Sequence, residues 1–354
     1  MAKVIILGDL HFGVRNCNDA IFFHQKKFFG FLFDYMEKNG ITKILQLGDT
    51  WDSRRTINFR ALDFAYTNFF DVLKAKGYEY HTLIGNHDIF YRDALDIHSP
   101  RLLLKNYDNV FVYDKPCSLD VDGCKFDIIP WICEENREEC LKAIEQSDSD
   151  YCLGHFEIGS FEVVHGVDFV GGLEPSFFSR FKRVFSGHFH QRSRKENICY
   201  VGTPYEITWG DVYRSKGFIV FDTENKKEMF VENPDKYFLE ITYDDSDNKI
   251  PNLKDYNLAN CFVKLLIKKK NEPYAYNVFV SKLYAQNPAD VKFIESSNLE
   301  GDAVIDVDVN SLKMEDVIKK YVEEKTSYGD KESLKGFLLK LYNEALLQSE
   351  KDVL

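Results

Sequence analysis

The segment that decides the fold reads Ile44-Leu-Gln-Leu-Gly-Asp-Thr-Trp-Asp52, a short apolar run that ends at a glycine and two aspartates. The same arrangement occurs twice more. Residues 4–7 are followed by Gly8-Asp9, and residues 80–84 are followed by Gly85-Asn86-His87-Asp88. Short apolar runs bounded by such turns indicate strands. Functional residues of α/β folds gather at the carboxyl ends of strands, so we expect these turns to meet in one site.

Helical patterns lie between these strands, at residues 22–36 and 59–73. The alternation indicates βαβ units and an α/β sheet. Beyond residue 110 the expected strands are shorter, and Asp122-Gly123 predicts a hairpin turn between two of them. Strands expected near residues 198–201, 217–221 and 227–231 are assigned to a second sheet.

Two further polar blocks follow apolar runs in the second half of the chain, Gly154-His155 and Gly187-His188-Phe189-His190. With Asp9-Leu10-His11 and the two blocks quoted above, they supply carboxylates, imidazoles and one carboxamide. This mixture of donors suits Mn²⁺, iron or Zn²⁺ better than Ca²⁺ or Mg²⁺ alone. A lone histidine is more often structural, whereas five blocks that each follow a strand predict a shared metal site.

The composition sets limits on function. The apolar content of 44% is normal for a soluble globular protein, and no run approaches the roughly 18 apolar residues of a membrane span. The first apolar run is too short for a signal peptide, so we expect a cytoplasmic protein without membrane contact. The eight cysteines form no CxxC pair and are expected to be reduced and mostly buried, and their spacing does not support a zinc site.

The formal net charge of −12 argues, by itself, against nucleic-acid binding, which needs a basic surface. Bound divalent cations would offset part of this charge, and a partner subunit could supply a basic surface. Charge therefore leaves the substrate open.

The five blocks resemble the pattern of the calcineurin-like metallophosphoesterase superfamily, which runs D-x-H, GDxxD, GNH(D/E), GH and GHxH. All five occur in order, and the resemblance covers about residues 3–222. It implies a four-layer sandwich, with two β-sheets flanked by helices, and two divalent metal ions, Mn²⁺ first and Mg²⁺ as a possibility. The implied ligands are Asp9, His11 and His190 for the first metal, Asn86, His155 and His188 for the second, with Asp49 shared.

The resemblance also implies a catalytic role for His87, which would contact a phosphate oxygen or protonate the departing sugar oxygen. Asp52 could accept a hydrogen bond from the His87 ring and fix its tautomer. A histidine is expected near position 52 in cellular nuclease members, so Asp52 is a departure shared with phosphatases. Asp88 is the other candidate for this role, or else it only holds its turn. The remaining His24, His81, His98 and His165 lie outside every block, and we interpret them as structural or surface residues.

Longer segments resemble a narrower group, the SbcD-type nuclease subunits and their T-even bacteriophage relatives. The matching segments are residues 81–88, 112–116, 129–136, 172–177 and 202–205. They include positions without a metal role. The resemblance implies a Mn²⁺-dependent DNA exonuclease and endonuclease that processes double-strand ends with a coiled-coil ATPase partner of the SbcC type. The compact chain also favours a phage origin.

The same resemblance implies three parts: a nuclease domain over residues 1–235, a small α+β DNA-capping domain over 236–300, and C-terminal helices over 301–354 that bind the ATPase. Helical patterns at 312–325 and 331–348 fit this tail, although an amphipathic tail could equally fold back on its own domain. Family members form homodimers through helices of the catalytic domain. Residues 22–33 and 61–70 could supply that interface, with core packing as the simpler interpretation of their aromatic side chains.

Basic residues follow the polar blocks and could contact phosphates beside the scissile bond. These are Arg15, Arg54, Arg55, Arg192 and Arg194, with Lys195 next to the last of them. Ordinary solvated loop charge is the alternative for each of these residues and for the lysines at 268–270. Two other functions stay open: a stand-alone metallophosphatase or cyclic-nucleotide phosphodiesterase of the same fold, and a non-catalytic scaffold. The chain beyond residue 235 argues against the first, and the complete ligand set argues against the second.

Overall fold

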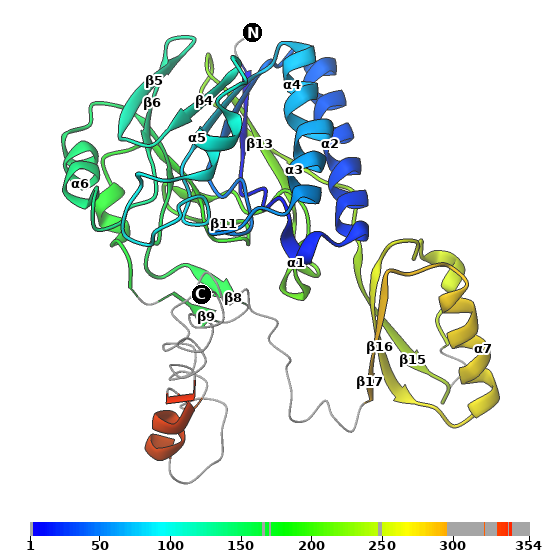
Figure 1. Cartoon of the computed structure of the whole chain (residues 1–354). Coiled ribbons are helices and arrows are strands. Elements are labelled where there is room, and N and C mark those ends of the chain that lie inside the picture. The colour runs from blue at the N-terminus through cyan, green and yellow to red at the C-terminus, as the bar shows by residue number, and fades with distance from the viewer. Residues whose placement is uncertain are drawn as a thin grey trace. The chain divides into compact units, whose positions relative to one another are not determined.

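The computed structural model describes residues 3–164, 167–169, 171–246, 250–295, 322, 331–338, 340 and 341. The chain divides into two compact units, Met1–Ile305 and Asp306–Leu354. Figure 1 shows the first unit as a layered α/β domain that is followed along the chain by a smaller sheet.

The first of two six-stranded sheets has the order β14-β13-β1-β2-β3-β4. Its four parallel strands are β1 (Lys3–Leu7), β2 (Lys43–Gln46), β3 (Glu79–Leu83) and β4 (Val110–Tyr113). The strand β13 (Gly217–Asp222) runs antiparallel to β1, and β14 (Glu228–Glu232) runs antiparallel to β13. The expected strands of the first half and their parallel arrangement are thus confirmed.

The second sheet has the order β11-β12-β10-β7-β6-β5. Its strands are β5 (Cys117–Val121), β6 (Cys124–Ile129), β7 (Tyr151–His155), β10 (Arg183–Gly187), β11 (Ser193–Lys195) and β12 (Ile198–Tyr200). The predicted hairpin joins β5 and β6, which pair antiparallel across the Asp122-Gly123 turn. The central strands β6, β7, β10 and β12 are parallel.

The assignment of residues 217–221 and 227–231 to the second sheet is wrong, because β13 pairs with β1 of the first sheet, with Lys3 opposite Asp222 and Ile6 opposite Ile219. The apolar residues of β13 are buried on both of its faces. Either sheet offers a covered position on both faces, so the sequence pattern could not tell which sheet the strand joins.

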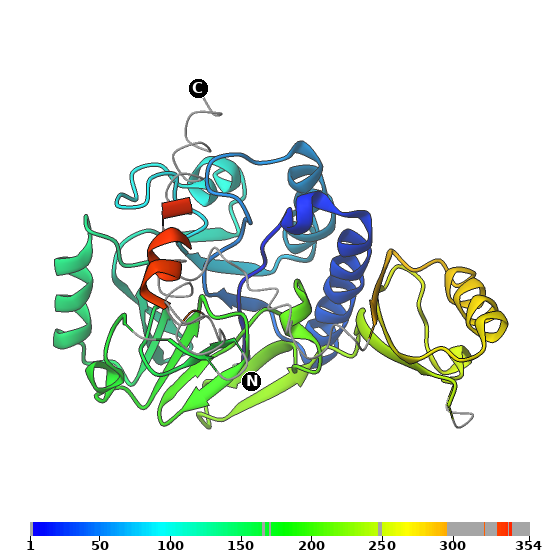
Figure 2. The same cartoon turned by 90° about the horizontal axis from the view of Figure 1, so that it is seen from below.

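Three apolar layers account for the stacking of the elements. Ile5 and Leu7 face α2 (Asp19–Asn39) and the helical segment formed by α3 (Phe59–Ala65), the π-helical turn η1 (Tyr66–Phe70) and α4 (Asp71–Lys76). Val4 and Ile6, which alternate with them, face the second sheet. The far side of that sheet packs against α6 (Arg137–Gln146). Figure 1 and Figure 2 both show α6 and α2 on opposite sides, so the predicted four-layer α/β fold is confirmed.

Most aromatic side chains of α2 and the segment at 61–70 belong to the core, as Phe28, Phe29, Phe69 and Phe70 show. Phe23 of α2 is exposed, and so is Phe59, which begins α3 just before the second segment. Core packing therefore explains most of the aromatic content, and the expected homodimer stays a prediction.

A separate three-stranded parallel sheet follows residue 235, with the order β15-β16-β17. It consists of β15 (Phe238–Asp244), β16 (Phe262–Lys269) and β17 (Asp290–Glu295), with α7 (Pro273–Tyr284) between the last two. These strands and this helix lie within the range expected for a small α+β part, whose bounds and role as a DNA cap remain predictions.

The predicted helix at 312–325 lies outside the described residues apart from Val322. Within the predicted helix at 331–348, residues 331–338, 340 and 341 are described, and they are helical. Among the described residues, no helix combines the length and the apolar character that crossing a membrane requires.

Candidate metal centre

The seven predicted ligands come from the ends of five strands of the two large sheets. Asp9 and His11 follow β1, Asp49 follows β2, Asn86 follows β3, His155 ends β7, and His188 and His190 follow β10. All except the half-buried His190 are buried. Because parallel strands of both sheets end on the same side, residues far apart in the chain meet there.

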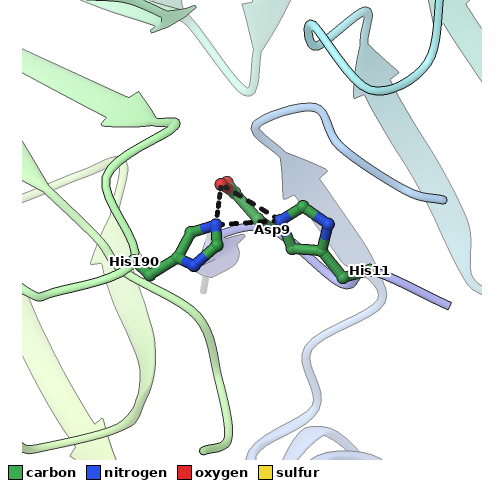
Figure 3. Close-up of side chains that lie close together, drawn as sticks. All are labelled: Asp9, His11 and His190. Carbon is green, nitrogen blue, oxygen red and sulfur yellow. Dashed lines mark hydrogen bonds and ion pairs between the residues drawn. The ribbon is translucent and has the colours of Figure 1, made fainter. Parts of the chain in front are cut away.

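Asp9, His11 and His190 form a first group of donors (Figure 3). The Nε2 atom of His11 lies 3.0 Å from Nε2 of His190, and each of these nitrogens lies 4.0 Å from Oδ2 of Asp9. Three donor atoms from two sheets thus point into one small space, which is the arrangement that a divalent transition metal requires.

Asn86, His155 and His188 form a second group around the Asn86 amide. The Oδ1 atom of Asn86 lies 2.9 Å from Nε2 of His155 and 2.9 Å from Nδ1 of His188. One oxygen and two imidazole nitrogens converge here in the same way as in the first group.

Asp49 lies between the two groups and faces both with one carboxylate oxygen. Its Oδ2 atom lies 3.9 Å from Nε2 of His11 in the first group and 3.3 Å from Nε2 of His155 in the second. The other oxygen, Oδ1, accepts a hydrogen bond of 2.7 Å from the main-chain N–H of His87. This hydrogen bond fixes the carboxylate so that Oδ2 faces both donor groups.

The turns that carry these ligands are packed against one another without room for a side chain at two glycines. A Cβ atom at Gly85 would lie 2.2 Å from Oδ1 of Asp49, and one at Gly187 would lie 2.5 Å from Oδ1 of Asp9. The glycines that open these sequence blocks therefore let the ligand turns approach each other. His11, Asp49 and His188 also have positive φ angles of 45°, 53° and 86°. Such strained conformations in non-glycine residues are typical of functional sites.

The hydrogen bonds around His155 show that the second group fits a cation. Its Nδ1 atom lies 2.7 Å from the main-chain carbonyl oxygen of Leu47 and must donate to it, so Nε2 of a neutral ring carries a lone pair. This lone pair faces the oxygens of Asn86 and Asp49, which are also acceptors. Without a cation, the reversed Asn86 amide would satisfy both rings, because Nδ2 would donate to Nε2 of His155 and to Nδ1 of His188. With a cation between these groups, the amide oxygen would face it, because oxygen is the atom of the amide that binds metals. The donor set therefore fits a metal ion as predicted.

The ionisation of the ligands without a metal supports the same conclusion. Burial raises the pKa of Asp9 to about 7, and the neighbouring Asp49 charge adds to the rise. Burial opposes the charge of His155, but Asp49 and Asp9 outweigh it and raise the pKa of this imidazole to about 9. Burial also opposes the charge of Asp49, yet His155 and His87 hold its pKa well below the ordinary value. Without a metal, a proton therefore occupies His155 at neutral pH and part of Asp9, while Asp49 stays ionised, so protons compete with a cation for two of the ligands.

His87 is oriented by residue 52, but through the main chain. Its Nδ1 atom lies 2.6 Å from the main-chain carbonyl oxygen of Asp52, which fixes the tautomer with Nδ1 protonated. The Asp52 carboxylate, to which the sequence assigned this role, lies 3.5 Å from Nδ1 of His11. The His87 ring stands edge-on to the His11 ring, with 4.9 Å between centroids. His87 therefore lies beside the first donor group.

Asp88 holds two turns together, which was the second of its two predicted roles. Its Oδ1 atom accepts hydrogen bonds from the main-chain N–H groups of Thr50 and Trp51, at 3.0 and 3.3 Å. Its Oδ2 atom accepts one of 3.0 Å from Gly85. These three hydrogen bonds make Asp88 a link between the Asp49 and Asn86 turns, and burial raises the pKa of its carboxyl to about 7.

The predicted DNA-binding arginines differ in where they lie. Arg54 lies beside the second donor group, since its Nη2 atom is 3.2 Å from the other amide atom of Asn86, which is Nδ2 when Oδ1 faces the two histidines. Burial lowers the pKa of Arg54 while the Asp49 carboxylate acts in the opposite direction, which places the guanidinium within electrostatic reach of the shared ligand. Arg55, next to it, is exposed.

The other three arginines contact residues away from the donor groups. Arg15 lies over the rings of Phe238 and Phe262 in the small sheet, at 5.5 and 5.1 Å from their centroids. Arg192 lies 4.2 Å from the ring centroid of Phe230, and Arg194 forms an ion pair of 2.6 Å with Glu228. Their contact with DNA stays a prediction.

Two residues that the sequence reasoning did not assign support the second group. Glu157 lies two positions after His155, and its Oε1 atom is 3.5 Å from Nε2 of His188, opposite the nitrogen that faces Asn86. The ring of Trp131 packs against His155 and His188, with centroids 5.8 and 5.2 Å away. The sequence could have pointed to Trp131, because it lies in residues 129–136, one of the segments that carried the narrower resemblance. No sequence pattern pointed to Glu157, because its contact with His188 depends on tertiary packing.

The remaining described histidines belong to neither donor group. His24 lies between Asp235 and the main-chain carbonyl of Asn260. His81 stacks on Phe111, and His98 accepts a hydrogen bond from the N–H of Arg101 at the start of α5 (Ser99–Leu104). These three are structural residues, as expected, and His165 lies outside the described residues.

Comparison with known proteins places this geometry in context. Residues 2–192 match the family described as "Calcineurin-like phosphoesterase". The chain is 35% identical to "Exonuclease subunit 1" of Enterobacteria phage T4 over 345 residues. This alignment covers 97% of this chain and 99% of the phage protein. A solved structure described as "GAP50 the anchor in the inner membrane complex of Plasmodium" aligns with 83% of this chain and 98% of its own, at 12% identity. Its TM-score of 0.36 is too low to support a conclusion.

Proposed function

The chain belongs to the calcineurin-like phosphoesterase family, and on this premise we propose that it is the nuclease subunit of a DNA repair or recombination complex. As a member of that family it is a metal-dependent phosphodiesterase. The proposed reaction is hydrolysis of DNA phosphodiester bonds, as an exonuclease and endonuclease at double-strand ends. The observation that carries the proposal is the pair of donor groups that share Asp49, in a chain similar over nearly its whole length to an exonuclease subunit.

We propose two Mn²⁺ ions as the cofactors, with Mg²⁺ as a weaker substitute. Asp9, His11 and His190 would hold the first, Asn86, His155 and His188 the second, and Asp49 both. Bound there, the two ions would polarise the phosphoryl group and supply a hydroxide near neutral pH. Nitrogen makes up four of the seven donors, and this favours Mn²⁺ over an all-oxygen metal such as Mg²⁺.

The chain itself binds and orients the phosphate and moves a proton. The Arg54 guanidinium, close to Asn86, can bind a nonbridging phosphate oxygen. His87 keeps its Nδ1 proton on the carbonyl of Asp52, so a second proton, carried on Nε2 in the imidazolium form, is the one that it can donate to the departing sugar oxygen. The His87 main chain at the same time fixes Asp49, which couples the proton donor to the shared ligand.

The remaining parts of the proposal concern partners. The relative in phage T4 is described as a subunit, and a coiled-coil ATPase of the SbcC type is the partner that we propose here. In this scheme residues 236–300 cap the DNA, residues 301–354 bind the ATPase, and two copies of the chain form a homodimer. Such a complex would act in the cytoplasm of the host cell, where its DNA substrate lies.

The test is a nuclease assay on linear duplex DNA with Mn²⁺, using wild type, Asp49→Asn and His87→Gln. Asp127→Asn is the matched control, because Asp127 is also a buried carboxylate but lies on β6 and accepts hydrogen bonds from Ser149 and Ser118, at 2.6 and 2.7 Å. We expect DNA hydrolysis by wild type and the control, and a loss of about 10²-fold or more in both site variants. Hydrolysis of nucleotides or cyclic nucleotides without any hydrolysis of DNA would contradict the proposal.

A further inference from the structure

A buried ammonium group lies behind His190, on the main-chain side of this ligand. The side chain of Lys216, the residue just before β13, is 0% exposed. Its Nζ atom lies 2.5 Å from Oδ1 of Asp211, 2.7 Å from the main-chain carbonyl oxygen of His190 and 2.8 Å from Oγ1 of Thr203. The three protons of the ammonium thus match three acceptors.

Asp211, the partner of Lys216, is equally well held. Its side chain is 2% exposed, and its Oδ2 atom accepts hydrogen bonds of 2.9 Å from the main-chain N–H groups of Ile207 and Thr208. Burial opposes its charge, but Lys216 outweighs burial and lowers the pKa of the carboxyl. The two residues therefore form an ion pair at neutral pH, anchored to the loop between β12 and β13.

Stability alone does not account for a buried ion pair at this place. Burying two charges carries a desolvation cost that often exceeds their attraction, and apolar side chains of similar volume are often as stabilising. What the pair provides here is position. The carbonyl of His190 accepts from the Lys216 ammonium and from the N–H of Thr203, at 2.7 and 3.1 Å, so two donors hold the main chain of this ligand.

We propose that Lys216 is a positioning residue for the first metal site. Its ammonium, held by Asp211, fixes the main chain at His190 so that the His190 imidazole reaches the cation beside Asp9 and His11. A variant without the ammonium keeps all the metal ligands, but its His190 imidazole can turn away from Asp9 and His11. The proposal concerns the metal site and does not depend on DNA being the substrate.

The test is the binding of Mn²⁺ to the full-length chain. Isothermal titration calorimetry and the electron paramagnetic resonance signal of free Mn²⁺ both measure this binding. The variants are Lys216→Met and the double variant Lys216→Met/Asp211→Asn, which leaves no unpaired buried charge. The control is Arg183→Met, which breaks the partly buried Arg183–Glu228 ion pair of 3.1 Å between β10 and β14. Thermal unfolding without metal is measured for each variant.

We expect both Lys216 variants to bind one Mn²⁺ with wild-type affinity and the other about 10- to 100-fold more weakly, the usual effect of losing a residue that supports a ligand. Saturating Mn²⁺ should then restore the wild-type turnover number, because the ligands themselves are intact. Arg183→Met should lower the unfolding temperature and leave both Mn²⁺ affinities unchanged. Wild-type binding of both ions by the folded double variant would overturn the proposal, as would equal weakening of both ions.

If Lys216→Met does not fold, the double variant decides the question. The Lys216 variants could bind one Mn²⁺ more weakly, as expected, while the wild type does not cut DNA. That result would uphold the role of Lys216 and overturn only the proposed nuclease function. The two proposals therefore fail separately.

Discussion

The Nδ1 atom of His87 lies 2.6 Å from the main-chain carbonyl oxygen of Asp52. Because a main-chain atom makes this contact, the tautomer of His87 does not depend on the side chain at position 52. The carboxylate of Asp52 lies 3.5 Å from the Nδ1 atom of His11.

We therefore predict that Asp52→Asn and His87→Ala differ in their effects. His87→Ala should lower kcat by about 10²- to 10⁴-fold, because it removes the proton donor. Asp52→Asn should lower kcat by less than about tenfold, since an amide of nearly the same shape can lie beside His11 and the main-chain contact with His87 remains. Steady-state kinetics at saturating Mn²⁺ measures both, and equal losses would show that the carboxylate orients His87 after all.

Arg54 and Arg55 form a matched pair of neighbouring cations, one turned to the donor groups and one exposed. Arg54→Ala should lower kcat/KM for DNA by about 10- to 100-fold, the value of one charge-assisted hydrogen bond in a buried site. Arg55→Ala should change it by less than about threefold, because solvent screens an exposed charge. If both variants lost activity to the same extent, general attraction of DNA would explain the effect better than contact with the reacting phosphate.

Glu157 supports His188 from the side opposite the second donor group. Glu157→Gln should weaken one Mn²⁺ equivalent by about tenfold, because an amide orients an imidazole less strongly than a carboxylate does. Glu174→Gln is the control, since Glu174 is an exposed glutamate of the following segment. Calorimetric titration with Mn²⁺ measures the affinities of both variants. Identical binding curves for Glu157→Gln and Glu174→Gln would show that Glu157 does not support the metal site.

Several features of the site could be predicted from the sequence because they are local. Asp9, Asp49, Asn86, His155 and His188 each lie directly after a glycine at the end of an apolar run, where strand ends meet in an α/β fold. The alternation of strands and helices likewise predicted βαβ units in one sheet, and β1, β2 and β3 lie side by side in it as parallel strands.

What could not be predicted depends on contacts between distant segments. The sheet that β13 joins, the carbonyl that orients His87 and the carboxylate that supports His188 are all set by tertiary packing. Arg15 shows the same limit, since its position after the first block suggested a phosphate contact, whereas its guanidinium lies over two rings of the small sheet. A sequence pattern gives the residue type and its place along the chain, but not the atom that it meets.

The affinity for Mn²⁺ should rise with pH. Without metal, burial raises the pKa of Asp9 to about 7, and Asp49 and Asp9 raise that of His155 to about 9. Both groups must lose a proton before they bind a cation, so protons compete with Mn²⁺ below these pKa values. Between about pH 6 and about pH 8 the dissociation constant should therefore fall, with protons released on binding. Calorimetry in buffers of different ionisation enthalpy measures this release, and pH-independent binding would contradict the assignment of these two ligands.

The most direct measurement of the central claim is a crystal structure of the Mn²⁺-loaded protein, with anomalous difference maps at the manganese absorption edge. Two peaks are expected, one bounded by Asp9, His11 and His190 and the other by Asn86, His155 and His188, with Asp49 in contact with both. A single peak, or peaks that do not share Asp49, would contradict the two-metal centre on which the proposed phosphodiester hydrolysis depends.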